Sequence, residues 1–275
     1  MRTTHRLLAL AGAIPFTLAT ALLGAAPASA ADNASVAILH AVPDATVDVY
    51  VDGKALLTDF EPGTLTDPQS LPAGSYDLKV VKAGDGADGD AIVEANNVDV
   101  PGGANITVVA HLDEDGDAAL TPFVNDTDTL EAGEARVTAR HTAAAPEVDV
   151  RAGGEPVFSG LSNPDEDSAV VDAGSIEADV VLAGTDDVAI GPADVNLEEG
   201  TSTIVYAWGS AEDDNLELAV QVIDGLHGNP DGVPGGDGGP AAAVTPLAVA
   251  MIVLAGVGIA LSARRSPRSK VHAAS

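Results

Sequence analysis

Two histidines at matching positions are the first side chains in this sequence that could do chemistry. His40 and His141 each stand near the end of a run of alternating apolar residues. A histidine can act as a base near neutral pH or bind a metal ion through a ring nitrogen. Both histidines are in phase with the apolar residues of their runs, as side chains that face a core would be. We therefore expect two separate buried histidines, hydrogen-bonded to a neighbouring strand or loop, with Asp48 and Asp149 as candidate partners.

Acidic loops are the second group, because carboxylate oxygens are ligands that calcium prefers. The densest is Asp113-Glu114-Asp115-Gly116-Asp117, and Asp165-Glu166-Asp167 is another. The first loop does not fit the EF-hand template, since Ala118 stands where glycine is needed and Val124 where a glutamate is needed. The pattern favours solvated hairpin loops, and weak calcium binding is the alternative. The candidate calcium ligands are Asp113, Asp115, Asp117, Asp85, Asp88 and Asp90.

The signatures of enzymes and of bound cofactors are missing from the sequence. It contains no cysteine, which excludes disulfides, thiol nucleophiles and cysteine-ligated metals. It also lacks a nucleophile elbow, a phosphate-binding glycine loop and a zinc-protease motif. Aromatic residues are 3% of the chain, with Trp208 as its one tryptophan, too few for a stacked carbohydrate platform. We therefore expect neither an enzyme nor a cofactor.

The charge of the chain is strongly negative, at −30 for 275 residues. All 42 acidic residues lie between Asp32 and Asp237, and only six basic residues accompany them, which leaves this stretch near −36. Such a charge repels nucleic acid and favours cations and basic partners. The sequence therefore predicts no nucleic-acid partner, and an acidic surface adapted to salt is the simplest interpretation.

The elements that must position these residues come from a duplication with a period near 100 residues. The segment VAILHAVPDATVDVYVDG at 36–53 matches VTARHTAAAPEVDVRAGG at 137–154, and the run ITVVAH later matches TIVYAW. Alternating apolar residues and turn signals indicate seven or eight short strands per copy, with no amphipathic helix. The sequence predicts an all-β fold of two tandem antiparallel β-sandwich domains, immunoglobulin-like in architecture, at 31–130 and 131–225.

Both ends of the chain have the patterns of targeting segments. Residues 1–30 read as a secretory signal peptide with a cleavage site at Ala28-Ser29-Ala30, and an uncleaved anchor is the alternative. Residues 241–263 carry no charge and are long enough to span a bilayer as a helix. A Gly/Pro-rich stalk at 226–240 precedes this segment, and a basic tail at 264–275 follows it. No sortase motif is present, which favours a membrane tether over covalent attachment to the wall.

The segment His40 to Tyr50, HAVPDATVDVY, resembles the opening motif of a bacterial family of unknown function, DUF 4397. The following residues, including the turn LPAGSY at Leu71 to Tyr76, are also similar to that family. The second copy is degenerate, because TAAAPE replaces the motif's Pro-Asp-Ala segment and Arg151 replaces its tyrosine. The resemblance implies exported, repeated, surface-anchored β domains, and it brings no catalytic residues.

These observations predict an extracellular surface protein held in the cell membrane by a single C-terminal helix, with its C-terminus in the cytoplasm. The expected role is a binding or adhesion module of the envelope that contacts cell-wall polymer or another surface protein. An acidic structural spacer without a specific ligand is the alternative. The preference for binding comes from the use of sandwich end loops in recognition, which is an analogy from architecture.

Overall fold

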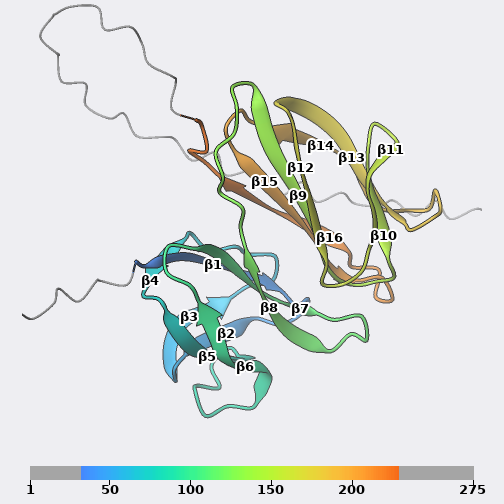
Figure 1. The fold of residues 1–275 in the computed structure, drawn as a ribbon. Helices are drawn as coiled ribbons and strands as arrows, with labels where there is room; N and C mark the ends of the chain where they lie inside the picture. The colour runs from blue at the N-terminus through green and yellow to red at the C-terminus, as the bar shows by residue number, and fades with distance from the viewer. Residues whose placement is uncertain (1–31, 229–275) are drawn as a thin grey trace, which may run out of the picture. The chain divides into compact units, whose positions relative to one another are not determined.

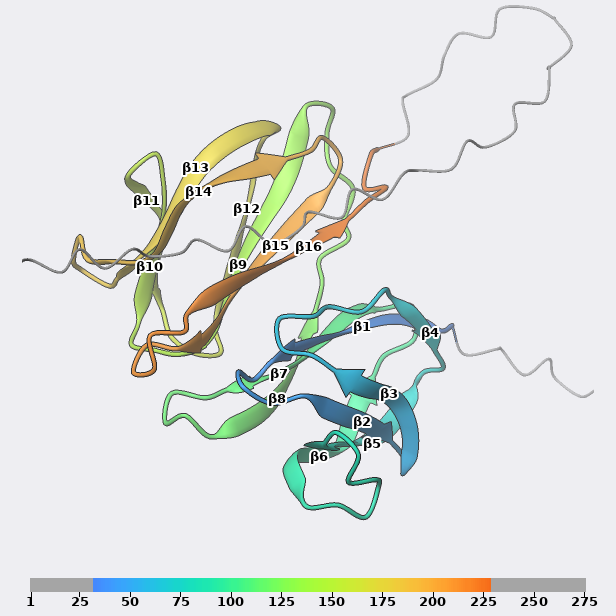
Figure 2. The ribbon, with the colours of Figure 1, turned by 180° about the vertical axis from the view of Figure 1, so that it is seen from behind.

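The computed structural model describes residues 32–228 (Figure 1). This stretch forms sixteen β-strands and contains no helix. The all-β class is confirmed. The two halves of the stretch are called the first and the second sandwich below, and Figure 2 shows them from behind.

The first sandwich consists of two four-stranded sheets. One sheet has the order β4-β1-β7-β8, from the strands β1 (Ala34–Ala41), β4 (Gln69–Leu71), β7 (Asn105–Leu112) and β8 (Ala118–Val124). The other has the order β3-β2-β5-β6, from β2 (Val47–Val51), β3 (Lys54–Phe60), β5 (Gly74–Lys82) and β6 (Ala91–Val100). Apolar side chains of both sheets pack into the interior, with Val36, Ile38 and Val80 among them.

The second sandwich has the same strand order, strand for strand. One sheet runs β12-β9-β15-β16, from β9 (Glu134–Ala144), β12 (Glu166–Asp172), β15 (Ser202–Ser210) and β16 (Glu217–Ile223). The other runs β11-β10-β13-β14, from β10 (Val148–Ala152), β11 (Glu155–Leu161), β13 (Gly174–Leu182) and β14 (Val188–Leu197). Eight strands per half agree with the number expected from the turn signals.

The prediction of purely antiparallel sheets is wrong for one sheet in each half. β1 pairs with β7 in parallel, and β9 pairs with β15 in parallel, whereas the remaining ladders are antiparallel. Turn signals predict hairpins between consecutive strands, but they do not predict pairing between strands far apart in the chain. The immunoglobulin-like part of the expectation stays a prediction.

The targeting segments lie outside the described residues, namely the signal peptide at 1–30, most of the stalk at 226–240, the apolar segment at 241–263 and the tail at 264–275. Between residues 32 and 228, no helix is long and apolar enough to cross a membrane. The fold continues past β16, because Leu226 is buried and Leu130 pairs with His227 in an isolated bridge.

A further apolar cluster joins the two sandwiches. It contains Leu39 of β1 and Val109 of β7 together with Tyr206 and Trp208 of β15. Both faces of β1 and β7 are therefore covered, one by their own sandwich and the other by β9, β15 and β16. This explains why β1 is apolar along nearly its whole length instead of alternating with polar residues.

Candidate binding site

His40 is buried and supports a loop. Its Nε2 lies 2.6 Å from the Ala45 carbonyl oxygen, and the Val42 N–H approaches its Nδ1 at 3.4 Å. These contacts suit the neutral ring with its proton on Nε2. Burial lowers the pKa of His40, although the hydrogen bond to Ala45 partly opposes this. The histidine holds the β1–β2 loop in place, which is a structural task.

The expected partnership with Asp48 is wrong. The Asp48 carboxylate accepts hydrogen bonds from the N–H groups of Asp59, at 2.9 Å, and Gly84, at 3.0 Å. In the second sandwich Asp149 accepts in the same way from Gly160 and Gly184, at 2.8 and 2.9 Å, and these two bonds lower the pKa of Asp149. Each aspartate ties its central strand to the neighbouring strand, β3 or β11, and to the turn after β5 or β13, and these partners are distant in sequence from the histidines.

His141 repeats the arrangement of His40, with Nε2 3.0 Å from the Pro146 carbonyl oxygen. Its pKa is lowered by burial. A third buried histidine, His111 of β7, is bonded at both ring nitrogens, to the Leu112 carbonyl and to the Thr121 hydroxyl, each at 2.8 Å. Burial also lowers the pKa of His111, and nearby His141 adds to the effect. These contacts assign the three rings to packing and loop support.

The acidic loops do not converge on a common centre. Asp113 accepts the backbone N–H groups of Asp115 and Asp117 through one oxygen, at 3.0 and 2.9 Å, as in an ordinary hairpin turn. Asp85, Asp88 and Asp90 lie in the β5–β6 turn region. Within residues 32–228, no three histidine, cysteine or acidic side chains are grouped so that they could hold one metal ion. Calcium binding by Asp113, Asp115, Asp117, Asp85, Asp88 and Asp90 stays a prediction.

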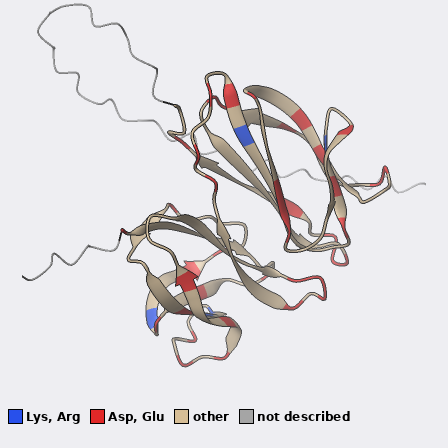
Figure 3. Cartoon of the chain, in the orientation of Figure 1, with Lys and Arg blue, Asp and Glu red and all other residues tan. Residues whose placement is uncertain are grey.

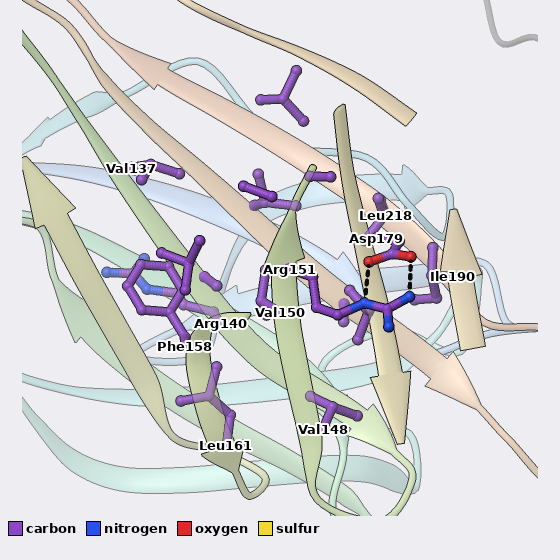
Figure 4. A pocket seen from close by; sticks show the side chains of 18 of the residues that line it. Val137, Arg140, Val148, Val150, Arg151, Phe158, Leu161, Asp179, Ile190 and Leu218 are labelled. Carbon is purple, nitrogen blue, oxygen red and sulfur yellow. Dashed lines mark hydrogen bonds and ion pairs between the residues drawn. The ribbon is translucent and has the colours of Figure 1, made fainter. Parts of the chain in front are cut away.

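An apolar cavity of about 70 Å³ lies inside the second sandwich (Figure 4). The matching space in the first sandwich is about 40 Å³. Ala139 and Ala178 line the larger cavity where the first sandwich has Ile38 and Leu78, so smaller side chains account for the difference. Figure 4 shows Arg151 paired through two nitrogens with Asp179, at 2.9 and 2.6 Å. The space is about half of an apolar cavity that binds benzene, which marks it as a packing gap.

A polar network crosses the cluster between the two sandwiches. Arg140 is 2% exposed, and its guanidinium group lies 4.4 Å from the centre of the Phe123 ring. It donates to Glu166 at 2.6 Å and to the Tyr206 hydroxyl at 2.7 Å. The Tyr206 hydroxyl in turn donates to Gln221 at 2.6 Å. Because each buried group has a partner, the charge of Arg140 is tolerated and fixes how the two sheets meet.

A cleft of about 470 Å³ opens beside this interface, within the size range of ligand-binding pockets. Three exposed carboxylates stand around half-buried apolar and amide groups and one buried indole. The lining residues are Pro43, Asp44, Ala45, Thr46, Glu61, Pro62, Trp208, Asn215 and Glu217. The side chains come from the loops that follow β1 and β3 and from the β15–β16 hairpin, so both sandwiches contribute.

Trp208 is one of the residues that line the cleft, and it is 5% exposed. Its indole N–H has no acceptor among the described residues. Gly63 allows the ring to approach, because a Cβ atom at that position would come within 2.9 Å of the indole, and its φ of +73° also favours glycine. A buried donor without a partner is costly in a folded protein.

The wall of the cleft is held by His40. The hydrogen bond from its ring to the Ala45 carbonyl fixes the loop that carries Pro43 and Asp44, and Asp44 itself has a positive φ of 60°. The motif that resembles the known family thus builds one side of the cleft. Its histidine acts on the site through the loop, without lining the space itself.

The corresponding place in the second sandwich is closed by a side chain. Strand registers match Trp208 with His111, whose ring nitrogens are both bonded. Asn163, which matches Pro62, donates to the carbonyl oxygens of Leu112 and Ala143, at 2.7 Å each. The two matching places therefore differ. The one at His111 and Asn163 is closed by hydrogen bonds, and the one at Trp208 is open and leaves the indole N–H without an acceptor among the described residues.

Sequence reasoning missed the cleft and most of its residues. In the sequence Trp208 is distinguished only as the one tryptophan, Glu61 and Asn215 lie in loops and Glu217 begins β16, and no motif indicates that any of them contacts a ligand. One usable signal was present, because the runs ITVVAH and TIVYAW are apolar on both faces, which indicates strands covered on two sides. That signal points to an interface between the copies, where the cleft lies.

A comparison with protein families supports the resemblance over part of the chain. Residues 34–151 match the model of a domain of unknown function, DUF4397. The match spans the eight strands of the first sandwich and extends through β9 into β10. No curated protein matches the chain.

Proposed function

We propose that this protein is a membrane-anchored extracellular binding module of the bacterial envelope, and that the cleft at Trp208 is its binding site. The observation that carries the proposal is a cleft of about 470 Å³ that is lined by loops of both sandwiches and by the buried Trp208. The signal-peptide pattern at 1–30 supports export, and the apolar segment at 241–263 supports anchoring in the membrane. The absence of a catalytic motif from the sequence agrees with binding without chemistry.

The second sandwich is, in this proposal, a diverged copy of the first. The matching strand orders and the shared His-to-carbonyl and Asp-to-turn contacts support common descent. Divergence gave the second copy Trp208, and Glu217 in its β15–β16 hairpin, while the first copy kept the loop with Asp44. A single sandwich would hold only part of the site.

A structural spacer is the second candidate, and the Arg140 network favours it. The network and the apolar cluster around it fix one sandwich against the other, as a stiff spacer requires. Acidic residues are spread over both sandwiches, with few basic ones, which would keep such a spacer solvated (Figure 3). The spacer role does not account for the open cleft, because a spacer needs no ligand.

Co-sedimentation of the full-length chain, kept in mild detergent, with purified cell-wall sacculi separates the two candidates. We expect saturable binding that survives moderate salt and is weakened by Glu61→Gln and Glu217→Gln together. Glu155→Gln, an exposed carboxylate outside the cleft, is the matched control and is expected to bind as the parent does. If the chain neither sediments with sacculi nor binds envelope proteins, the result favours the spacer.

A further inference from the structure

β16 is an edge strand of the second sandwich, and its outer side has no backbone partner among residues 32–228 (Figure 2). Its seven residues pair with β15 without a register shift, so the edge is regular along its whole length. Only its first residue, Glu217, is charged, and Val220 and Val222 are 53% and 50% exposed. An edge of this kind offers a row of unpaired N–H and C=O groups to which another strand can bind.

The other seven edge strands of the described sheets carry features that hinder such pairing. β4 is only three residues long, and β12 carries three acidic residues. β8, β11 and β14 each contain a proline. Register shifts interrupt the ladders of β3 and β6, which also contain charged residues. β16 has neither a proline nor a register shift nor a charge beyond its first position, so it is the edge that stays open to a partner strand.

Comparison of the two sandwiches shows which way the backbone of β16 points. Val205 pairs with Val220, and the matching Val108 pairs with Pro122, so Val220 stands where β8 has its proline. Proline has no N–H and fits an edge strand only where that group would point away from the neighbouring strand. The N–H of Val220 therefore points away from β15, toward the open side. The first sandwich blocks this position and the second leaves it free.

A second copy of β16 complements this edge about a twofold axis at Val220. In antiparallel pairing centred there, Val220 lies opposite the partner's Val220, and Leu218 lies opposite the partner's Val222. These residues share one face of the strand, so the exposed valines of both copies come together. Glu217 lies opposite the partner's Ile223, so no like charges face each other across the pair.

The charge of the molecule favours this contact over other contacts between two copies. Residues 32–237 carry a net charge near −36, so most surfaces of two chains repel each other. Residues 218–223 carry no charge and avoid that repulsion at the point of contact. The joined sheet has eight strands, four from each copy, which is within the usual size of sheets.

We infer that two copies of this protein associate through β16, with the strands antiparallel and Val220 on the twofold axis. The second copy supplies both the free backbone groups and the alternating apolar side chains that this edge matches. The inference does not depend on the cleft, because Val220 and Val222 do not line it. Two chains held in one membrane, as the proposed function has them, meet at a raised effective concentration.

Crosslinking tests the register directly, because the chain has no cysteine of its own. Val220→Cys, in the full-length chain in mild detergent, places two thiols opposite each other with Cα atoms about 5.5 Å apart, within reach of a disulfide. Val222→Cys places them about 14 Å apart, which is too far. We expect about fivefold more crosslinked dimer from Val220→Cys, by mild oxidation or with a short bismaleimide. Val170→Cys, 48% exposed on the edge strand β12, is the matched control and should crosslink as little as Val222→Cys.

A second set of variants tests the backbone pairing. Leu218→Cys and Val222→Cys in one chain are opposite each other in the pair and should crosslink. Adding Val220→Pro to that chain copies Pro122, removes the outward N–H and should lower the crosslinked fraction about fivefold. Val220→Thr keeps the N–H and the branched shape and should leave the crosslinked fraction unchanged. Val220→Lys opposes two charges across the axis and should lower it as the proline does.

The result that overturns the inference is equal crosslinking of Val220→Cys and the Val170→Cys control. Equal crosslinking of Val220→Cys and Val222→Cys overturns the twofold register, and crosslinking that survives both Val220→Pro and Val220→Lys overturns the pairing through β16. Capture of a different chain by Val220→Cys, with no dimer, would show that the edge binds a foreign strand instead. Added salt should raise the dimer fraction, because it screens the repulsion between two acidic chains.

Discussion

The two sandwiches share their strand order and differ in what their matching side chains contact. Leu39 of the first sandwich packs in the joining cluster, whereas Arg140 at the matching position brings a charge into the same cluster. His111 has both ring nitrogens bonded, whereas the matching Trp208 leaves its N–H free of described partners. The difference teaches that the ladders preserve the topology while the outer faces of β1, β7, β9 and β15 are free to diverge into an interface and a cleft.

The loss of Arg140 should produce the largest effect. Arg140→Ala is expected to lower the free energy of unfolding by about 3 kcal/mol, because it removes a buried, hydrogen-bonded charge and leaves a void against Phe123. Urea titration of the full chain followed by Trp208 emission measures it. Arg140→Leu, which copies Leu39, should lose clearly less. Equal stability of the alanine variant and the parent would show that the network does not hold the sandwiches together.

The paired aspartates should give the next largest effect and rank the two copies. Asp48→Ala is expected to cost about 2 kcal/mol, because two backbone N–H groups lose a charged acceptor at a buried site. Asp149→Ala should cost less, since its carboxylate is more accessible to water, which can replace it. Urea titration of both variants gives the ranking. The reverse order would show that burial of the carboxylate does not decide the size of the effect.

The cavity in the second sandwich should respond to filling. Ala139→Ile installs the residue found at the matching position, Ile38, and is expected to add about 1 kcal/mol of stability. Shortening the matching side chain by Ile38→Val should lower the free energy of unfolding by about 1 kcal/mol, because the first sandwich is already filled there. Thermal unfolding of both variants compares them directly. Destabilisation by Ala139→Ile would indicate that the gap collapses in solution.

The histidines should have the smallest effect at neutral pH and a growing one in acid. Burial lowers the pKa of His40, His111 and His141, so the unfolded chain binds protons more readily than the folded one. Their contribution to stability is complete above the ordinary histidine pKa of about 6.5 and is lost as the pH falls below it. Unfolding free energies measured from pH 7.5 to 5 should therefore decline, and His111→Gln should flatten the slope. If the variant leaves the pH dependence of the unfolding free energy unchanged, His111 does not contribute to it.

Local pattern determined a large part of this protein. The alternation of apolar residues and the turn signals of the sequence give strands and no amphipathic helix over 32–228, and the phase of His40 and His141 indicates that they face an interior. The opening motif also identified the family that residues 34–151 match. These features depend on neighbours along the chain, where a period of two residues decides which side chains share a face.

Only the tertiary structure decided what covers each face. Arg136 and Arg140 alternate with apolar residues, a pattern that fits a strand with one face in water, yet both are buried. Arg136 lies against the segment 126–128 and Arg140 lies over the Phe123 ring of β8. His40 found the Ala45 carbonyl instead of Asp48, and Asp44, Glu61 and Trp208 met in one cleft. Such contacts join residues up to 164 positions apart, and they are set by strand order and by sheet-on-sheet packing. Neither leaves a periodic trace in the sequence, since the same alternation serves a face in water and a face against protein.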